Sequence, residues 1–389
     1  MSREQRAEDG IRAFHRPFLW AGIAGLVACA IGFAVWPLQF FRSYLFAYLF
    51  WMSIGLGCLP ILMMYHLVGG AWGYSIRRLM ESGTRTIVLL AILFILVLAG
   101  MSEIYKWVSP QDPTVGEAVI KKSLYLNVPF FIARAVFFFL LWWFYANRLN
   151  RWSRVQDETG DIGLLRHFSR LSGPGLTFYG LTITFALIDW AMSLEPRWYS
   201  TIYGLLWVVD TGLSALAFCI VVFTFLSDRY PLSEVARPEN LHDLGNLLFA
   251  FLMLWAYLSF SQLLIMWSGD IPEEIDWYLS RLRHGWEWTA AALIVFQFFV
   301  PWFLLLSRRK KRNPRTLGYI ALVVLAMRLV DTYWMITPAF FPDGFTIHWL
   351  DPVALVGIGG IWLAIYVRQL TAMPLLALND PNTVPHKAI

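Results

Sequence analysis

The chain has 389 residues, of which 58% are hydrophobic, 17% aromatic and only 15% charged. The mean hydropathy of +0.56 leaves too few polar groups to cover a water-soluble globule of this length. The net charge of +5 and the isoelectric point near 9.1 do not indicate nucleic-acid binding. In a membrane protein, a basic excess marks the loops that face anionic lipid.

Ten apolar stretches follow one another along the chain. Each is roughly 18 to 25 residues long, which at about 1.5 Å per residue is enough for a helix to cross the ~30 Å hydrocarbon layer. Lipid offers the backbone no hydrogen bonds, so only helices or closed barrels span it. We therefore predict an all-α integral membrane protein with ten transmembrane helices, at residues 18–36, 44–68, 86–103, 127–147, 174–192, 203–226, 244–267, 286–306, 316–337 and 352–371.

Lys and Arg residues between the stretches fall mainly on one side. The segment before the first stretch and the loops after every second stretch hold 21 of them, whereas the loops on the other side hold 7. Because basic loops stay in the cytoplasm, both termini are predicted to be cytoplasmic. The chain then divides into an N-terminal segment at 1–17, a ten-helix membrane domain at 18–372 and a cytoplasmic tail at 373–389.

The placement of cysteine and histidine argues against several redox centres in this chain. Cys29, Cys58 and Cys219 lie singly in three predicted helices, without the paired spacing that holds an iron-sulfur cluster or zinc. Of the 7 histidines, only His66 falls within a predicted helix, so a membrane haem lacks two axial ligands. We expect no haem, no iron-sulfur cluster and no metal site here. Any electron transfer would then run through a partner or a diffusible carrier.

A short sequence pattern occurs twice. Asp189 and Asp331 each lie near the end of an apolar stretch, and Pro196 and Pro338 follow them at the same offset. Because the two stretches are four spans apart, their helices run in the same direction. Helices 2–5 and 6–9 are therefore expected to form two parallel four-helix bundles, with helices 1 and 10 outside them. Chance similarity between apolar sequences is the alternative.

Five ionisable residues lie at lipid depth: Arg134, Asp189, Asp210, Arg328 and Asp331. A charge there costs about 2.5–3.5 kcal/mol, so such residues usually face a protein interior or a water-filled path. At about 1.5 Å per residue, all five fall roughly 5 to 14 Å below the outer boundary and form one layer. Arg328 and Asp331 share a helix face and are expected to pair. Asp189 and Asp210 are expected to share Arg134, or to hold protons because burial disfavours the charged form.

These five residues are candidates for a proton pathway or for contact with a quinone, and no catalytic residue is predicted. A buried carboxylate beside a quinone headgroup can accept protons as the quinol is oxidised. The alternative is a set of salt bridges that only fixes helix packing. Glu103, Glu195 and Glu287 lie at outer helix ends, and His66 lies near the inner face. They are candidate groups for proton uptake or release, or ordinary interfacial side chains.

Several segments resemble the smaller of the two large polytopic subunits of alternative complex III, which is distantly related to the membrane subunit of polysulfide reductase. They are GGAWG at 69–73, RRL at 77–79, MSLEPRWYSTIYG at 192–204, DLGNLLFAF at 243–251, WAY at 255–257, SQ at 261–262, WSG at 267–269 and IPEE at 271–274. The resemblance covers roughly residues 14–372, and the SLEP and IPEE segments are its most specific parts.

The resemblance implies a subunit of a respiratory or photosynthetic quinol:cytochrome c oxidoreductase in the bacterial inner membrane. Its expected partners are the larger sister polytopic subunit, an iron-sulfur subunit, multihaem cytochrome c subunits and lipids. In that family the sister is the stronger candidate for the quinol site. This subunit is the second quinone-binding one, or is proposed to conduct protons, and has no redox centre of its own. A quinone or menaquinone is the implied carrier.

Two other classes of function are open. A secondary transporter also has many spans, but its binding site is typically built from paired interrupted helices in corresponding halves. Here Pro60 interrupts the second span, while the sixth has only Gly212. A purely structural scaffold would keep full turnover of its complex when Asp189 or Asp331 is changed to Asn. An intramembrane hydrolase is disfavoured because no nucleophile and base are positioned together.

Overall fold

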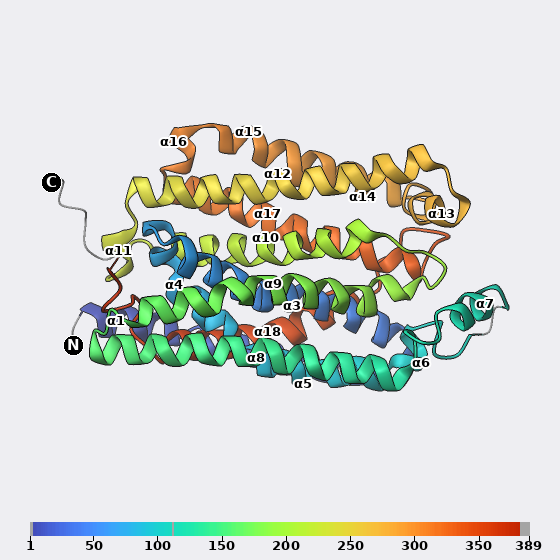
Figure 1. Ribbon diagram of the computed structural model, residues 1–389, viewed down its shortest axis with the longest axis horizontal. Helices are drawn as coiled ribbons and strands as arrows, with labels where there is room; N and C mark the ends of the chain where they lie inside the picture. Colours follow the sequence, from blue (N-terminus) through green and yellow to red (C-terminus); the bar gives the residue numbers. More distant parts are fainter. Residues whose placement is uncertain (1–2, 111–112, 382–389) are drawn as a thin grey trace.

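The computed structural model describes residues 3–110 and 113–381, and this part of the chain contains helices and turns but no strand. The long elements lie side by side along the long axis of the molecule (Figure 1). They are α2 (His15–Val35), α3 (Pro37–Val68), α5 (Ile87–Ala99), α8 (Val128–Thr159), α9 (Leu164–Trp190), α10 (Thr201–Leu226), α12 (Pro238–Gly269), α14 (Trp286–Ala292) continued by η2 (Leu293–Phe299) and α15 (Val300–Leu306), α17 (Pro314–Ile336) and α18 (Leu350–Leu370).

The other helices connect or cap these elements. They are α1 (Arg3–Arg12), α4 (Ala71–Thr84), α6 (Met101–Ile104), α7 (Pro113–Lys121), η1 (Met192–Leu194), α11 (Leu232–Val235), α13 (Pro272–Arg281), α16 (Arg308–Lys311) and η3 (Thr337–Ala339). In Figure 1, α1, α11 and α16 lie at one end of the bundle, and α6, α7 and α13 lie at the other.

The predicted all-α membrane architecture is confirmed. Among the described residues, nine helices are each long and apolar enough to cross a membrane, and the α4–α5 pair adds a tenth such segment that is bent by 41°. The predicted number of ten is therefore reached when the bent pair counts as one span. Helices α3, α8 and α12 have 32 residues each. At about 1.5 Å per residue they exceed the hydrocarbon thickness and continue beyond it.

Helix α4 is the clearest departure from the sequence prediction, which places residues 69–85 in a cytoplasmic loop. Two glycines with positive φ, Gly69 at 72° and Gly70 at 101°, reverse the chain between α3 and α4. Every residue from Gly73 to Thr84 is buried. A hydropathy average predicts that this segment is exposed to water because the segment is rich in charged residues. The average contains no information on ion pairs, which neutralise these charges inside the protein.

The contacts among the long helices can be followed group by group, although α10 also packs closely on α3 and α9, so the predicted division into two four-helix bundles stays a prediction. In the first group α3 contacts α5 and α9, and α8 contacts α5 and α9. In the second, α10 contacts α12 and α17, and α15 contacts α12 and α17. Helices α3 and α10 join the two groups, while α2 and α18 pair with each other beside α3. Helices α9 and α17 also both end in a 3-10 turn, η1 and η3.

Glycines let α2 and α18 approach to backbone contact. A Cβ atom on Gly25 would lie 2.6 Å from the Cα of Gly357, and one on Gly22 would lie 2.5 Å from the backbone nitrogen of Ile361. Small residues at such crossings allow close van der Waals packing, which drives helix association where the hydrophobic effect is absent. This contact ties the first long helix of the chain to the last.

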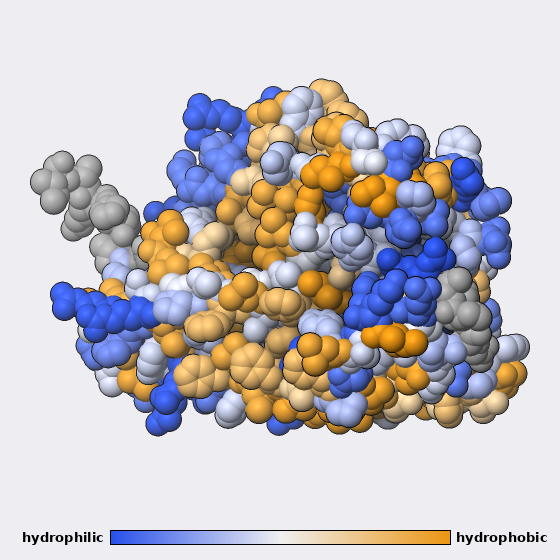
Figure 2. Space-filling model, turned by 45° about the vertical axis from the view of Figure 1, so that its right-hand side comes forward, coloured by the Kyte–Doolittle hydropathy of each residue, from blue (hydrophilic) through white to orange (hydrophobic). Residues whose placement is uncertain are grey.

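The surface has the character of a membrane protein. Figure 2 shows apolar side chains over much of one face and polar side chains gathered toward its two ends. Large apolar residues on the outside include Trp20 at 66% exposure, Tyr257 at 66% and Phe303 at 62%. The described ends of the chain lie at the same end of the bundle, because Arg12 Nη2 donates a hydrogen bond to the carbonyl of Thr371 at 3.2 Å. Which side of the membrane they occupy stays a prediction.

Candidate functional site

The five predicted buried charges form two separate groups. In the first, Arg134 of α8 binds Asp189 of α9 through two hydrogen bonds, from Nε to Oδ2 at 2.7 Å and from Nη2 to Oδ1 at 2.9 Å. Arg134 Nη1 also donates to the carbonyl of Tyr125 at 3.1 Å. The guanidinium lies 3.9 Å from the ring centroid of Tyr125 and 4.2 Å from that of Phe130. This bidentate ion pair links α8 to α9, and both carboxylate oxygens of Asp189 are occupied by hydrogen bonds from Arg134.

In the second group, Arg328 of α17 faces two carboxylates. Its Nη2 atom lies 3.0 Å from Asp210 Oδ2 on α10, and its Nη1 atom binds Asp331 Oδ2 one turn along α17. The expected Arg328–Asp331 pair is therefore present. The expectation that Asp210 shares Arg134 is wrong. Asp210 faces Arg328 instead, because α10 packs against α17.

The net charge of this second group depends on whether its two acids are ionised. Arg328 and Asp210 are 0% exposed and Asp331 is 2% exposed. One guanidinium and two carboxylates leave a net negative charge if both acids are ionised, and an uncompensated charge in a buried site is costly. One proton shared by the two acids neutralises the group, and the proton then belongs to the pair as a unit.

Two neutral side chains complete the shell around Arg328. Its Nε atom donates to Ser214 Oγ at 3.4 Å. With the Gln297 amide oxygen turned toward the guanidinium, Gln297 accepts from Arg328 Nη1 at 3.0 Å and donates to the carbonyl of Met327 at 3.0 Å. Gln297 lies in η2, a π-helical segment that interrupts the eighth span. Such segments occur frequently at functional sites.

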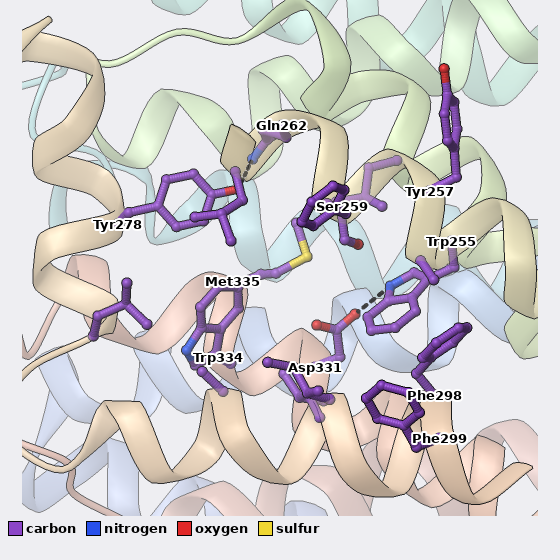
Figure 3. A pocket seen from close by; sticks show the side chains of 18 of the residues that line it. Trp255, Tyr257, Ser259, Gln262, Tyr278, Phe298, Phe299, Asp331, Trp334 and Met335 are labelled. Carbon is purple, nitrogen blue, oxygen red and sulfur yellow. Dashed lines mark hydrogen bonds between the residues drawn. The ribbon is translucent and has the colours of Figure 1, made fainter. Parts of the chain in front are cut away.

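A cavity of about 550 Å³ opens beside Asp331. Its walls come from α10, α12, α13, α14, η2 and α17 and are mostly apolar and aromatic. Figure 3 shows Asp331 pointing toward Trp255, whose Nε1 atom donates to Asp331 Oδ2 at 3.3 Å. Asp331 is the only one of the five predicted charges, all within the described chain, that lines this cavity.

A second pair of polar side chains, Gln262 and Tyr278, lines the cavity. Gln262 Nε2 donates to the hydroxyl of Tyr278 at 3.3 Å, and Figure 3 shows the two side chains meeting on the far side of Met335 from Trp255. Ser200 Oγ donates in turn to Gln262 Oε1 at 3.2 Å. An apolar space with a few placed polar groups is the usual form of a small-molecule site.

At the end of the bundle that holds α13, Glu195 pairs with Arg281. Arg281 Nη2 donates to Glu195 Oε2 at 3.1 Å and to the carbonyl of Met335 at 3.0 Å, and its guanidinium lies 3.8 Å from the ring centroid of Trp277. Trp277 also borders a second, more polar cavity of about 510 Å³, which Glu195 lines. Of the three acids predicted at outer helix ends, Glu195 lines this cavity. Glu103 is exposed, and Glu287 accepts a hydrogen bond from Gly285 N at 2.8 Å.

A buried charge cluster at the opposite end of the bundle, near the described ends of the chain, is not predicted from the sequence. Arg77 binds Glu81 at 2.9 Å and Asp380 at 2.6 Å, while Arg78 binds Glu81 at 2.6 Å and also Asp157. The chain before residue 381 thus lies against α4 and α8. The spacings of three and four residues from Arg78 and Arg77 to Glu81 suit a helix and are the available signal, but the charge density of the segment predicts a loop.

His66 lies beside this cluster. Its ring stacks on Phe168 at 4.2 Å between centroids with an interplanar angle of 8°. The guanidinium of Arg77 lies 5.3 Å from the same Phe168 ring, on which it makes a cation-π contact. The predicted relay role of His66 is not tested by this arrangement.

No protein-family model matches this sequence, and no curated protein matches it either. In the described part of the chain, no group of three or more His, Cys, Asp or Glu side chains is arranged to hold a metal ion. The assignment of a function therefore depends on the geometry of the site and on the resemblance carried by the sequence segments.

Proposed function

We propose that this chain is an integral membrane subunit of a quinol:cytochrome c oxidoreductase of the alternative complex III type, in the bacterial inner membrane. It is the quinone-binding subunit 2 type, which supports quinol oxidation and conducts protons without a redox centre of its own. The observation that carries the proposal is the position of Asp331. This carboxylate belongs to a buried group of two acids and one arginine, and it also lines an aromatic cavity between helices that are apolar enough to span a membrane.

The chemistry follows from these neighbours. A cavity of about 550 Å³ falls in the usual size range of small-molecule sites and has room for a quinone ring. Asp331 shares Arg328 with Asp210, so a proton taken up by one acid relieves the repulsion between them. Asp331 would accept a proton from a quinol ring in or beside the cavity. The electrons would pass to the iron-sulfur and cytochrome subunits.

Glu195 offers a release group for such protons. The two cavities share Trp277, and the Glu195–Arg281 pair lies against that residue. Glu195 is 24% exposed at its side chain, so it reaches the outer surface. We place proton release at this end, with Gln262 and Tyr278 as the polar groups between Asp331 and Glu195.

The partner prediction is tested by gentle detergent extraction from native membranes. We expect this chain to migrate with a larger polytopic subunit, an iron-sulfur subunit and multihaem cytochromes, and the preparation to oxidise quinol. Recovery of the chain alone, without quinol oxidation, would overturn the assignment and favour a transporter.

The proton role is tested with Asp331→Asn, using Asp189→Asn as the matched control. General acid–base groups typically contribute about 10²- to 10⁴-fold, so Asp331→Asn should lower quinol turnover of the assembled complex at least roughly tenfold. Asp189→Asn should leave turnover of whatever complex assembles close to the wild-type value, because Asp189 does not line the Asp331 cavity and is held by Arg134. Equal turnover in both variants and the wild type would mean that Asp331 only fixes packing.

One observation favours a purely structural role, and only for the pair of Arg134 and Asp189. Arg134 and Asp189 form a closed bidentate pair between α8 and α9. We assign this pair to helix packing and keep the proton role for Asp331, Asp210 and Arg328.

A further inference from the structure

A dense group of basic residues joins α15 to α17. Six of the nine residues from Ser307 to Arg315 are Lys or Arg. All six except Lys311 are exposed. In Figure 1, α16 lies at the end of the bundle that also holds α1 and α11. Basic loops of this kind orient a chain in the membrane, and the structure shows that three of these residues also line a cavity.

The cavity has a volume of about 530 Å³ and lies between the first turns of α12 and α17, beside α16. It is lined by Pro238, Arg308, Arg309, Arg312, Asn313 and Pro314. Its described lining therefore holds three guanidinium groups and no carboxylate. The cavity is positively charged.

These three arginines have no partner within the described part of the chain. Their side chains form neither an ion pair nor a hydrogen bond there, whereas Arg134 and Arg281 each bind a carboxylate. Two acids in the first turns of α12, Glu239 and Asp243, are exposed, and neither pairs with an arginine; Asp243 faces His242 instead, at 3.7 Å. The guanidinium groups around the cavity are thus free to bind an anion from outside the chain.

The backbone that carries the arginines is held in place. Lys311 is 7% exposed, and its Nζ atom donates to Asn246 Oδ1 of α12 at 2.5 Å. Its side chain packs on Gly245, where a Cβ atom would lie 2.8 Å from Lys311 Cγ. Asn313 Oδ1 caps α17 by accepting the Thr316 N–H at 3.1 Å. Helix α12 has no such side-chain cap, so its free N–H groups add a partial positive charge at the cavity.

Apolar surface begins directly beside the cavity. On α15, which ends one residue before α16, Phe303 is 62% exposed and Leu306 is 54% exposed. On α17, Tyr319 is 71% exposed and Leu322 is 48% exposed. Both helices belong to segments that are apolar enough to span a membrane. An anion bound in the cavity would therefore have lipid-facing helix surface next to it.

We propose that this cavity binds the phosphate of an anionic phospholipid, whose acyl chains lie along the exposed apolar surface of α15 and α17. Guanidinium groups stay charged and match the oxygens of a phosphate in pairs. A choline headgroup carries a cation that three arginines repel, so the net charge of the headgroup selects the lipid. The proposal does not depend on the proposed function.

The test counts lipids bound to the full chain in detergent by native mass spectrometry, with dioleoyl-phosphatidylglycerol as the probe. We expect one phosphatidylglycerol to bind more tightly than any further copy. The site variant combines Arg308→Gln, Arg309→Gln and Arg312→Gln. It should weaken binding of this first lipid at least about tenfold, because it removes several charge-assisted hydrogen bonds.

A matched control removes the same charge from exposed arginines of α8 and α9, through Arg151→Gln, Arg166→Gln and Arg170→Gln. This control should bind the first lipid as the wild type does. If both triple variants lost binding equally, the effect would be one of overall surface charge and the proposal would be wrong.

Two further ligands separate the lipid from its parts. Dioleoyl-phosphatidylcholine has the same acyl chains and should bind the wild type and the site variant alike, without a tight first copy. Inorganic phosphate should not displace phosphatidylglycerol, because it gains nothing from the apolar surface. A tight first copy of phosphatidylcholine would show that the acyl chains alone select the site. Displacement by inorganic phosphate would show a site for free anions. Either result would overturn the proposal.

The unfolding midpoint shows whether the site variant folds. In lipid-free detergent it should match the wild type, because Lys311 stays anchored and Lys310, Lys311 and Arg315 keep the loop basic. Phosphatidylglycerol should raise the midpoint of the wild type and not that of the site variant. Should the triple variant not fold, Arg309→Gln and Arg312→Gln are measured singly, and each should weaken binding about fivefold. Unchanged binding in both single variants would exclude the site.

Discussion

At the residue scale, the main result is that each buried acid has its own environment. Asp189 is locked by a bidentate arginine, Asp210 and Asp331 share one arginine, and Asp351 has only neutral partners. The sequence identifies the first three acids as buried because charges are rare in apolar stretches. It cannot pair them, since pairing depends on how each helix is rotated about its axis.

Arg328→Gln tests the two-acid group. The change leaves Asp210 and Asp331 without their cation, and breaking a buried pair typically costs about 3–5 kcal/mol. We expect a clearly lower thermal unfolding midpoint in detergent. Adding Asp210→Asn and Asp331→Asn should restore much of the loss, because no buried charge then remains.

Arg308→Gln is the control for this experiment, since Arg308 is exposed on α16, at the end of the bundle that also holds α1. It should unfold at the wild-type midpoint. If Arg328→Gln did so as well, the two acids would not depend on Arg328, and the charge balance assigned to this group would be incorrect.

At the element scale, α4 and η2 show how local segments serve the site. Helix α4 brings charged residues into the interior, where Glu81 of the same helix and Asp157 and Asp380 from other parts of the chain neutralise them. The π-helical turn of η2 places Gln297 against Arg328. Neither feature follows from hydropathy, which averages over a window and does not record a helix bend or a change of helical pitch.

Gly25→Ala tests the contact between α2 and α18. The new Cβ would lie 2.6 Å from Gly357 Cα, so the two helices must separate. Overpacking typically costs about 1–3 kcal/mol. We expect a lower unfolding midpoint and faster proteolysis near the N-terminus. Gly180→Ala in α9 is the control, because nothing lies within 4 Å of the place that its new methyl group would occupy. If the two variants were equally stable, the crossing would not depend on glycine.

At the scale of the whole molecule, the protein consists of two groups of long helices and the α2–α18 pair. Polar clusters lie at both ends of the bundle, and buried charges lie between them. The cluster around Glu81 and the pair of Glu195 with Arg281 lie at opposite ends of the bundle. Polar groups at both ends of a mostly apolar body are the layout of a membrane-spanning protein.

Single-cysteine labelling tests the orientation. Glu239→Cys and Glu273→Cys place an exposed thiol near opposite ends of α12. Acidic residues contribute little to topology, so neither change should alter insertion. In intact cells with a permeable outer membrane, an impermeant maleimide should label the thiol at 273 and spare the one at 239.

Inside-out vesicles should give the reverse result. The native Cys29, Cys58 and Cys219 are buried and should contribute little background. Labelling of the thiol at 239 in intact cells would mean that the basic loops face outward and that the predicted topology is inverted.

The sequence by itself determined the helical class, about ten apolar spans and three of the acids that are buried among them, because a residue's transfer cost from water to lipid is a local property that adds along a helix. Only the tertiary structure decided that α4 is buried, that Asp210 belongs to Arg328, and that Asp331 and Asp351 line two different cavities. These features depend on helix rotation and on contacts between residues far apart in the chain. Charge neutralisation and cavity shape are properties of that arrangement and not of any one segment.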